Sequence, residues 1–201
     1  MSVARAPDSA RAATTGTQIE SEVKGVWFVT MRSWLLEHHG AEALNRVAEC
    51  VGPFHKSTLT DPLPSAWYPE DALQSALRCM RSQLTLISDT AFLEALRSAS
   101  ELGISRFFRA VVRISSPPFL LRQVPTMWRQ IRRGAGRVEV ETLPGRCLIR
   151  YREFPYFDDP NYVLLTRGSL EALTRLCTGK PVVARIVAQD ASSLDVEIAF
   201  G

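Results

Sequence analysis

Lysine is almost absent from this chain of 201 residues: it occurs only at Lys24, Lys56 and Lys180, against 21 arginines. Long apolar runs are also absent, since none approaches the roughly 20 residues of a membrane span. Residues 1–17 lack the apolar stretch of a secretory signal. These absences argue against a membrane-spanning or exported chain, and we therefore expect a cytoplasmic protein.

Cysteine is scarce and dispersed. The four cysteines form no CxxC pair and no Cys/His cluster with zinc spacing. Isolated cysteines of this kind are usually small buried apolar residues in a reduced protein, with a reactive thiol or a metal ligand as the alternative. We expect no metal site. The residues concerned are Cys50, Cys79, Cys147 and Cys177.

The composition is that of a globular protein, with 46% hydrophobic and 22% charged residues. Residues 1–22 have no hydrophobic periodicity and are expected to form a flexible tail. Residues 23–201 are expected to form a single domain, with helices over about 23–133 and a sheet over about 134–201. Helices followed by an antiparallel sheet indicate an α+β fold in which an N-terminal helical layer packs on a small C-terminal sheet.

Apolar residues at helical spacing predict a series of helices before residue 134. Gly40 and Gly103 are expected to interrupt the pattern, and Pro125 to bend or divide the last helix. The prolines of residues 53–69 indicate a connector. The expected helices cover the segment ending at Gly40, 41–51, about 70–84, from Asp89 to Gly103, 104–114 and 119–133.

The periodicity changes from 3.6 to 2 at Gly134. Alternating residues from Val138 and again over 147–154 predict a hairpin. An amphipathic helix over 162–177, closed by Gly179, then precedes two further strands. The predicted order of the C-terminal part is therefore ββαββ.

Recognisable catalytic motifs are missing: there is no GxSxG, no GxxxxGK[ST] and no GxGxxG. An enzyme would need an acid–base group facing a cleft, and capping, turn and solvent-exposed roles are commoner for the residues available. We therefore expect no catalytic activity. The candidates for acid–base work are His38, His39, His55, Glu70 and Asp71.

Residues 97–137 contain nine arginines and one acid, Glu101, and so carry a formal charge of +8. Helical spacing places these arginines on shared faces, which predicts a basic docking surface for an acidic protein, or less readily for nucleic acid or an anionic membrane. A solvated face with no partner is the alternative. The proposed surface consists of Arg106, Arg109, Arg113, Arg129, Arg132 and Arg133.

Aromatic and branched residues also cluster in this region and beside the predicted hairpin. They form either ordinary core or the wall of a pocket for a small apolar ligand, because such pockets often lie where a helical layer meets a sheet. The pocket candidates are Phe107, Phe108, Val112, Phe119, Trp128, Ile131 and Tyr151.

Several motifs in order resemble a paralogous family of myxobacterial proteins, itself remotely similar to the haem-nitric-oxide-binding, 4-vinyl-reductase-like and TRAPP-subunit fold. The resemblance covers about residues 24–200. It implies helices packed on a small antiparallel sheet, enclosing a hydrophobic ligand or serving as an input or docking domain. The motifs are Trp67-Tyr68-Pro69, Phe107-Phe108-Arg109, the segment 116–121, Pro125-Thr126-Met127-Trp128 and the segment 136–140.

Two departures bear on function. The haem-binding relatives use a mid-chain histidine as iron ligand, and the matching helices here contain none, so we expect no haem and no other cofactor. The cysteines that suit a metal in some 4-vinyl-reductase-like domains are also missing from residues 187–200. The sequence thus predicts a non-enzymatic sensory or adaptor domain for a small apolar ligand, a protein partner or both, and leaves a homodimer open.

Overall fold

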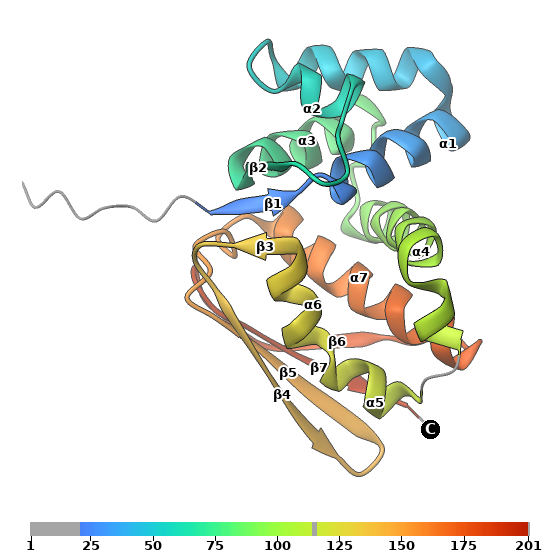
Figure 1. Cartoon of the computed structure of the whole chain (residues 1–201), viewed down its shortest axis with the longest axis vertical. Helices are drawn as coiled ribbons and strands as arrows, with labels where there is room; N and C mark the ends of the chain where they lie inside the picture. Colours follow the sequence, from blue (N-terminus) through green and yellow to red (C-terminus); the bar gives the residue numbers. More distant parts are fainter. Residues whose placement is uncertain (1–20, 114–115, 201) are drawn as a thin grey trace, which may run out of the picture.

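The computed structural model describes residues 21–113 and 116–200, with all of their side chains except those of 107–113. Seven helices in this part of the chain accompany two antiparallel sheets, so the predicted α+β class is confirmed (Figure 1). The helices are α1 (Val26–Val51), α2 (Lys56–Thr60), α3 (Glu70–Gln83), α4 (Asp89–Arg113), α5 (Pro117–Arg122), α6 (Val124–Ile131) and α7 (Pro160–Thr178). The strands are β1 (Glu22–Lys24), β2 (Trp67–Pro69), β3 (Arg132–Arg133), β4 (Arg137–Leu143), β5 (Arg146–Arg152), β6 (Ala184–Gln189) and β7 (Leu194–Ala199).

The larger sheet has the strand order β4-β5-β7-β6, and α7 connects its two hairpins. Gly145 takes the left-handed conformation, with φ of 71°, that the tight β4–β5 turn requires. Along β5, Cys147, Ile149 and Tyr151 are buried while the residues between them reach toward solvent. This alternation is the period-2 signal of the sequence, and the predicted ββαββ order is confirmed.

Helix α7 lies against the larger sheet and also contacts α4 (Figure 1). The Asp159 side chain caps its start by accepting a hydrogen bond from the backbone N–H of Asn161 at 2.9 Å. Gly179, with φ of 68°, ends it as a left-handed cap. Buried leucines such as Leu165 and Leu173 then bring α7 into the core.

Two glycines in the helical part behave differently from each other. At Gly40 the backbone is non-helical, with φ of 79°, and kinks α1 at the predicted position. Helix α4 instead runs without a break through Gly103, so the interruption predicted there is wrong. A Cβ at Gly103 would lie 2.7 Å from Thr30 Oγ1, so glycine at this position lets α1 and α4 approach closely.

A second small sheet, with the order β2-β1-β3, was not predicted. Its strands have only two or three residues, too few to show a periodicity. Val23 pairs with Tyr68 on one side and with Arg132 on the other, across large distances in the sequence. This pairing brings Arg132 beside the start of α3.

The cysteines are a further correction. Cys50 at the end of α1 and Cys79 in α3 form a disulfide, with Cα atoms 5.7 Å apart, so the expectation of four reduced cysteines is wrong. Disulfides are rare in reducing compartments, which weighs against the cytoplasmic location predicted from the sequence. Among the described helices, none is both long and apolar enough to cross a membrane.

Candidate functional site

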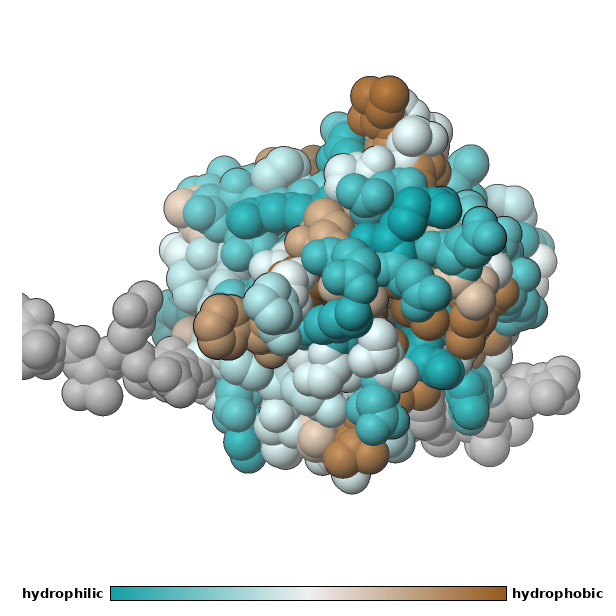
Figure 2. All heavy atoms as spheres, turned by 90° about the horizontal axis from the view of Figure 1, so that it is seen from above, coloured by the Kyte–Doolittle hydropathy of each residue, from teal (hydrophilic) through white to brown (hydrophobic). Residues whose placement is uncertain are grey.

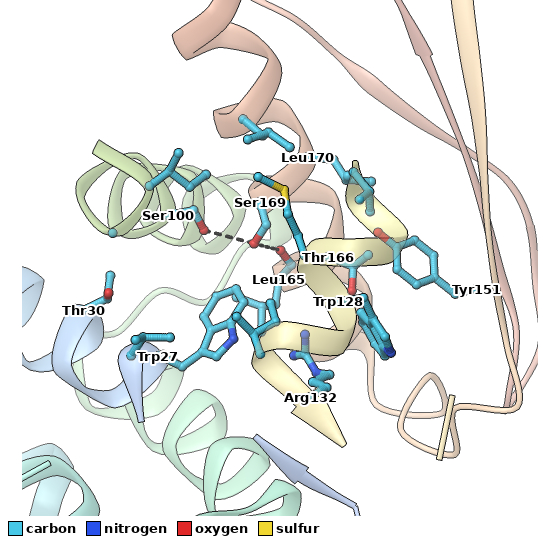
Figure 3. Close-up of a pocket in the computed structure, with 17 residues that line it drawn as sticks. Trp27, Thr30, Ser100, Trp128, Arg132, Tyr151, Leu165, Thr166, Ser169 and Leu170 are labelled. Carbon is cyan, nitrogen blue, oxygen red and sulfur yellow. Dashed lines mark hydrogen bonds between the residues drawn. The ribbon is translucent and has the colours of Figure 1, made fainter. Parts of the chain in front are cut away.

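A cavity of about 140 Å³ lies where α1, α4, α6, α7 and β5 meet (Figure 3). Its lining is dominated by aliphatic and aromatic side chains and contains no histidine, cysteine or carboxylate among the described residues. The lining residues are Val26, Trp27, Thr30, Ser100, Gly103, Ile104, Val124, Met127, Trp128, Ile131, Arg132, Tyr151, Leu165, Thr166, Ser169, Leu170 and Leu173.

Arg132 supplies the one charge in this lining. Its Nε donates a hydrogen bond to Glu70 Oε1 at 3.0 Å, and the side chains of both residues are almost fully buried. The Tyr162 hydroxyl donates to the same Glu70 oxygen at 2.8 Å. The other carboxylate oxygen, Glu70 Oε2, has no hydrogen-bond partner among the described residues. The cavity therefore borders a buried ion pair.

Aromatic rings surround the Arg132 guanidinium. Its Cζ lies 4.5 Å from the ring centre of Trp128, 5.4 Å from that of Trp27 and 5.6 Å from that of Phe154. Each ring presents its electron-rich face to a cation at this range. These contacts, together with Glu70, offset the cost of removing the charge from water.

The tyrosines near this pair are kept neutral. Burial raises the pKa of the Tyr151 phenol above its ordinary value, although the positive Arg132 opposes this shift. Burial and then the negative Glu70 raise the pKa of Tyr162 well above its ordinary value. Neither hydroxyl is therefore available as a base at neutral pH.

Three of the seven predicted pocket residues line the cavity: Trp128, Ile131 and Tyr151. Phe119 does not, because it lies on α5 with half of its surface exposed. The side chains of Phe107, Phe108 and Val112 lie outside the described residues.

The sequence reasoning missed the contributions of α1 and α4. Val26, Trp27 and Thr30 face the cavity from α1, and Ser100 and Gly103 face it from α4. The signal present in the sequence is a helical spacing of three, since Trp27 and Thr30, like Ser100 and Gly103, each share a helix face.

Only some of the six arginines predicted to form a basic docking surface are exposed to solvent. Arg132 is buried, because Glu70 and the aromatic rings hold it inside, and so it cannot belong to a docking face. Arg106, Arg129 and Arg133 are exposed, with Arg133 paired to Glu22. The side chains of Arg109 and Arg113 lie outside the described residues. A partner for the exposed arginines stays a prediction.

Acids from other parts of the chain balance much of the charge of residues 97–137. Arg97 lies 3.5 Å from Glu171, and Arg137 pairs with Glu139 and Glu153. Figure 2, which views the molecule from above Figure 1, shows a mixed face with apolar side chains scattered among hydrophilic ones. The formal charge of +8 for residues 97–137 therefore overstates the positive charge that this segment presents at the molecular surface.

None of the candidate acid–base residues lines the cavity, although Glu70 is paired with the lining residue Arg132. His38 and His39 are exposed and lie against the Trp34 ring, and burial followed by the neighbouring His38 lowers the pKa of His39. His55 Nε2 is 3.9 Å from an Asp71 oxygen. Within residues 21–113 and 116–200, no group of three His, Cys, Asp or Glu side chains could hold a metal ion. The expected lack of catalytic activity stays a prediction.

Comparison with solved structures gives the fold. The Fe(II) unliganded H-NOX protein from K. algicida matches with a TM-score of 0.64 at 11% identity, over 89% of this chain and 96% of the other. The S. oneidensis H-NOX protein in its Fe(II)NO state matches with a TM-score of 0.64 at 14% identity, over 89% and 99%. The chain has the H-NOX fold. No protein-family profile and no curated protein matches it.

These H-NOX neighbours correct the expectation that the chain takes no cofactor. One neighbour, with a TM-score of 0.60 and 15% identity over 88% of this chain, comes from a study of haem redox potential and porphyrin distortion. The fold is thus one whose solved examples include haem proteins, which contradicts the prediction of no cofactor. The remote similarity to the haem-nitric-oxide-binding fold is confirmed.

Proposed function

We propose that this chain is a sensory domain that binds a small apolar molecule in the cavity between α1, α4, α6 and α7. The observation that carries the proposal is the cavity itself, which is lined by apolar side chains from segments far apart in the sequence. An apolar lining favours apolar ligands, and an enclosed apolar cavity of about 150 Å³ is large enough to bind benzene. The H-NOX fold supports a ligand-binding role, since a neighbour was solved in an Fe(II)NO state.

Haem is the second candidate, because the neighbours favour it. The described lining offers two side chains of kinds that ligate haem iron, the Met127 thioether and the Tyr151 phenol, but no histidine. A volume of about 140 Å³ is also well below the roughly 300–1,000 Å³ of pockets for larger ligands. The cavity in this form does not fit a porphyrin.

Ligand titration tests the proposal. Ethylbenzene should raise the melting temperature of the full chain in a concentration-dependent manner, since a ligand that binds only the folded state stabilises it. Ile131→Phe should abolish this shift, because Ile131 lines the cavity and the larger ring fills it. Ile186→Phe is the matched control, since Ile186 is half-buried on β6 and outside the lining.

The haem alternative has a separate readout. Haemin added to the purified chain should leave the absorption spectrum that of free haemin if the cavity takes small apolar molecules alone. A bound-haem spectrum that changes in Met127→Leu or Tyr151→Phe would establish the second candidate instead. No shift with ethylbenzene, together with no haem binding, would refute both.

A further inference from the structure

One end of the cavity has a buried hydrogen-bond donor without an acceptor. The indole N–H of Trp27 is buried and has no partner among the described residues. Beside it, the Arg132 guanidinium has five N–H donors, and within the described part of the chain its hydrogen bond runs from Nε to Glu70, which leaves other N–H groups to meet a ligand. Figure 3 shows both side chains reaching the same part of the cavity. A buried donor without an acceptor is costly, so this end favours a ligand that brings one.

The two serine hydroxyls of the lining are already paired. The hydroxyls of Ser100 and Ser169 are hydrogen-bonded to each other at 3.1 Å, and Ser169 also donates to the Leu165 carbonyl at 2.7 Å (Figure 3). These two hydroxyls therefore need no hydrogen bond from a ligand. Among the described lining residues, Trp27 Nε1 is the buried polar side-chain atom without a hydrogen-bond partner, so the need for an acceptor is greatest at the end formed by Trp27 and Arg132.

Glu70 decides the charge of that acceptor. Its carboxylate already neutralises Arg132, and its Oε2 is a buried oxygen with no donor. A ligand carboxylate at Arg132 would add a second negative charge beside Glu70, in a site where burial already disfavours charge. A neutral oxygen accepts from the same donors without this repulsion.

We propose that the ligand is a small uncharged molecule with an apolar body and a single carbonyl oxygen, and that this oxygen accepts hydrogen bonds from Trp27 Nε1 and Arg132. The inference rests on the proposed function, because it concerns the same cavity. Leu165, Leu170 and Met127 hold the apolar body, and the volume of about 140 Å³ limits it to about one substituted ring.

Three probes of similar size test the inference on the wild-type chain by calorimetric titration. Acetophenone carries a neutral carbonyl, ethylbenzene has no acceptor, and benzoate has a charged one. Acetophenone should bind roughly threefold to tenfold more tightly than ethylbenzene, as expected for one or two added hydrogen bonds. Benzoate should bind more weakly than either.

Substitution of the donor sharpens the test. Trp27→Phe removes the indole N–H and keeps a ring, so it should reduce the preference for acetophenone while ethylbenzene still binds. Trp34→Phe is the matched control, because the Trp34 N–H donates to Ser98 Oγ at 3.0 Å and lies outside the cavity lining. It should leave the preference unchanged.

The outcomes separate the two proposals. Equal affinity for ethylbenzene and acetophenone would overturn this inference and leave the proposed function intact. Tightest binding of benzoate would also overturn it, since the ligand would then be an anion. Binding of none of the three probes would refute the proposed function and this inference together. The wild-type comparison decides between these results even if Trp27→Phe does not fold.

Discussion

Two arginine–glutamate pairs of equal length occupy opposite environments in this molecule. The Arg132–Glu70 pair in the helical interior and the Arg146–Glu197 pair on the sheet both have a nitrogen–oxygen distance of 3.0 Å. The side chains are 5% and 0% exposed in the first pair, and 52% and 24% exposed in the second. Distance therefore does not distinguish them. Burial does, because water screens the exposed sheet pair far more than the buried interior pair.

The helical interior and the larger sheet also differ in what surrounds their ion pairs. The interior pair contacts three aromatic rings and borders the cavity, and it joins α3 to β3. The sheet carries a series of ion pairs between neighbouring strands, such as the exposed Arg150–Glu141 and the partly buried Arg152–Asp195. The interior arginine thus joins two segments far apart in the sequence beside the candidate site, whereas those of the sheet connect neighbouring strands.

Removing the buried arginine should have the largest effect. Arg132→Ala leaves Glu70 buried without a counter-charge and should lower the free energy of unfolding by about 3–5 kcal/mol. Urea denaturation measures the loss. The double variant Arg132→Met with Glu70→Gln removes both charges and should recover much of it. A loss below about 1 kcal/mol would place the buried pair on the same footing as an exposed one.

Breaking the disulfide should come next. Cys50 and Cys79 are 29 residues apart and hold α3, the helix that carries Glu70, against α1. Replacing both by serine should cost roughly 2–4 kcal/mol, because the unfolded chain regains the freedom that the crosslink removes. Thermal unfolding with and without a thiol reductant checks this. Identical curves for the oxidised and reduced wild type would contradict it.

The loss of stability at alkaline pH tests the burial of Tyr151 on the inner side of the sheet. Burial raises the pKa of Tyr151, so the unfolded chain loses this proton at a lower pH than the folded chain does. The stability from this group is complete below pH 10 and falls by about 1.4 kcal/mol for each pH unit above it.

Tyr151→Phe should therefore match the wild type at pH 8 and lose less stability between pH 10 and 11, as measured by urea denaturation. Equal slopes in the two proteins would show that Tyr151 is not shielded from water. Tyr162, whose pKa is also raised, titrates in both proteins and provides the common background.

The smallest effect is expected on the outer face of the sheet. Arg146→Ala should change the free energy of unfolding by at most about 1 kcal/mol, and the change should shrink further in 1 M salt. Urea denaturation at two salt concentrations measures it. A loss as large as that of Arg132→Ala would remove the distinction between the two pairs.

Local signals were sufficient for much of the fold. The alternation around Ile149 predicted the sheet, Pro125 divided the last helix of the helical part, and Gly179 ended α7. Each of these features depends on neighbours within a few residues. The same reasoning failed at Gly103, where glycine serves a contact with Thr30 far away in the sequence rather than a break in the helix.

The candidate site was predicted only in part for the same reason. Trp128, Ile131 and Tyr151 stood near one another in the sequence and were found, whereas Trp27 enters from α1 and was not. The arginines of residues 97–137 gave a formal charge of +8. Which of them are exposed depends on acidic residues in distant segments, as the burial of Arg132 against Glu70 shows.

Patterns along the chain were enough to predict the α+β class and the ββαββ order of the larger sheet. The packed molecule reveals what they could not: Arg132 is buried, Cys50 pairs with Cys79, and the buried Trp27 N–H has no acceptor among the described residues. The difference is one of range. Periodicity, turns and caps are set by residues a few positions apart, while burial, pairing and hydrogen-bond satisfaction are set by whatever the fold brings alongside.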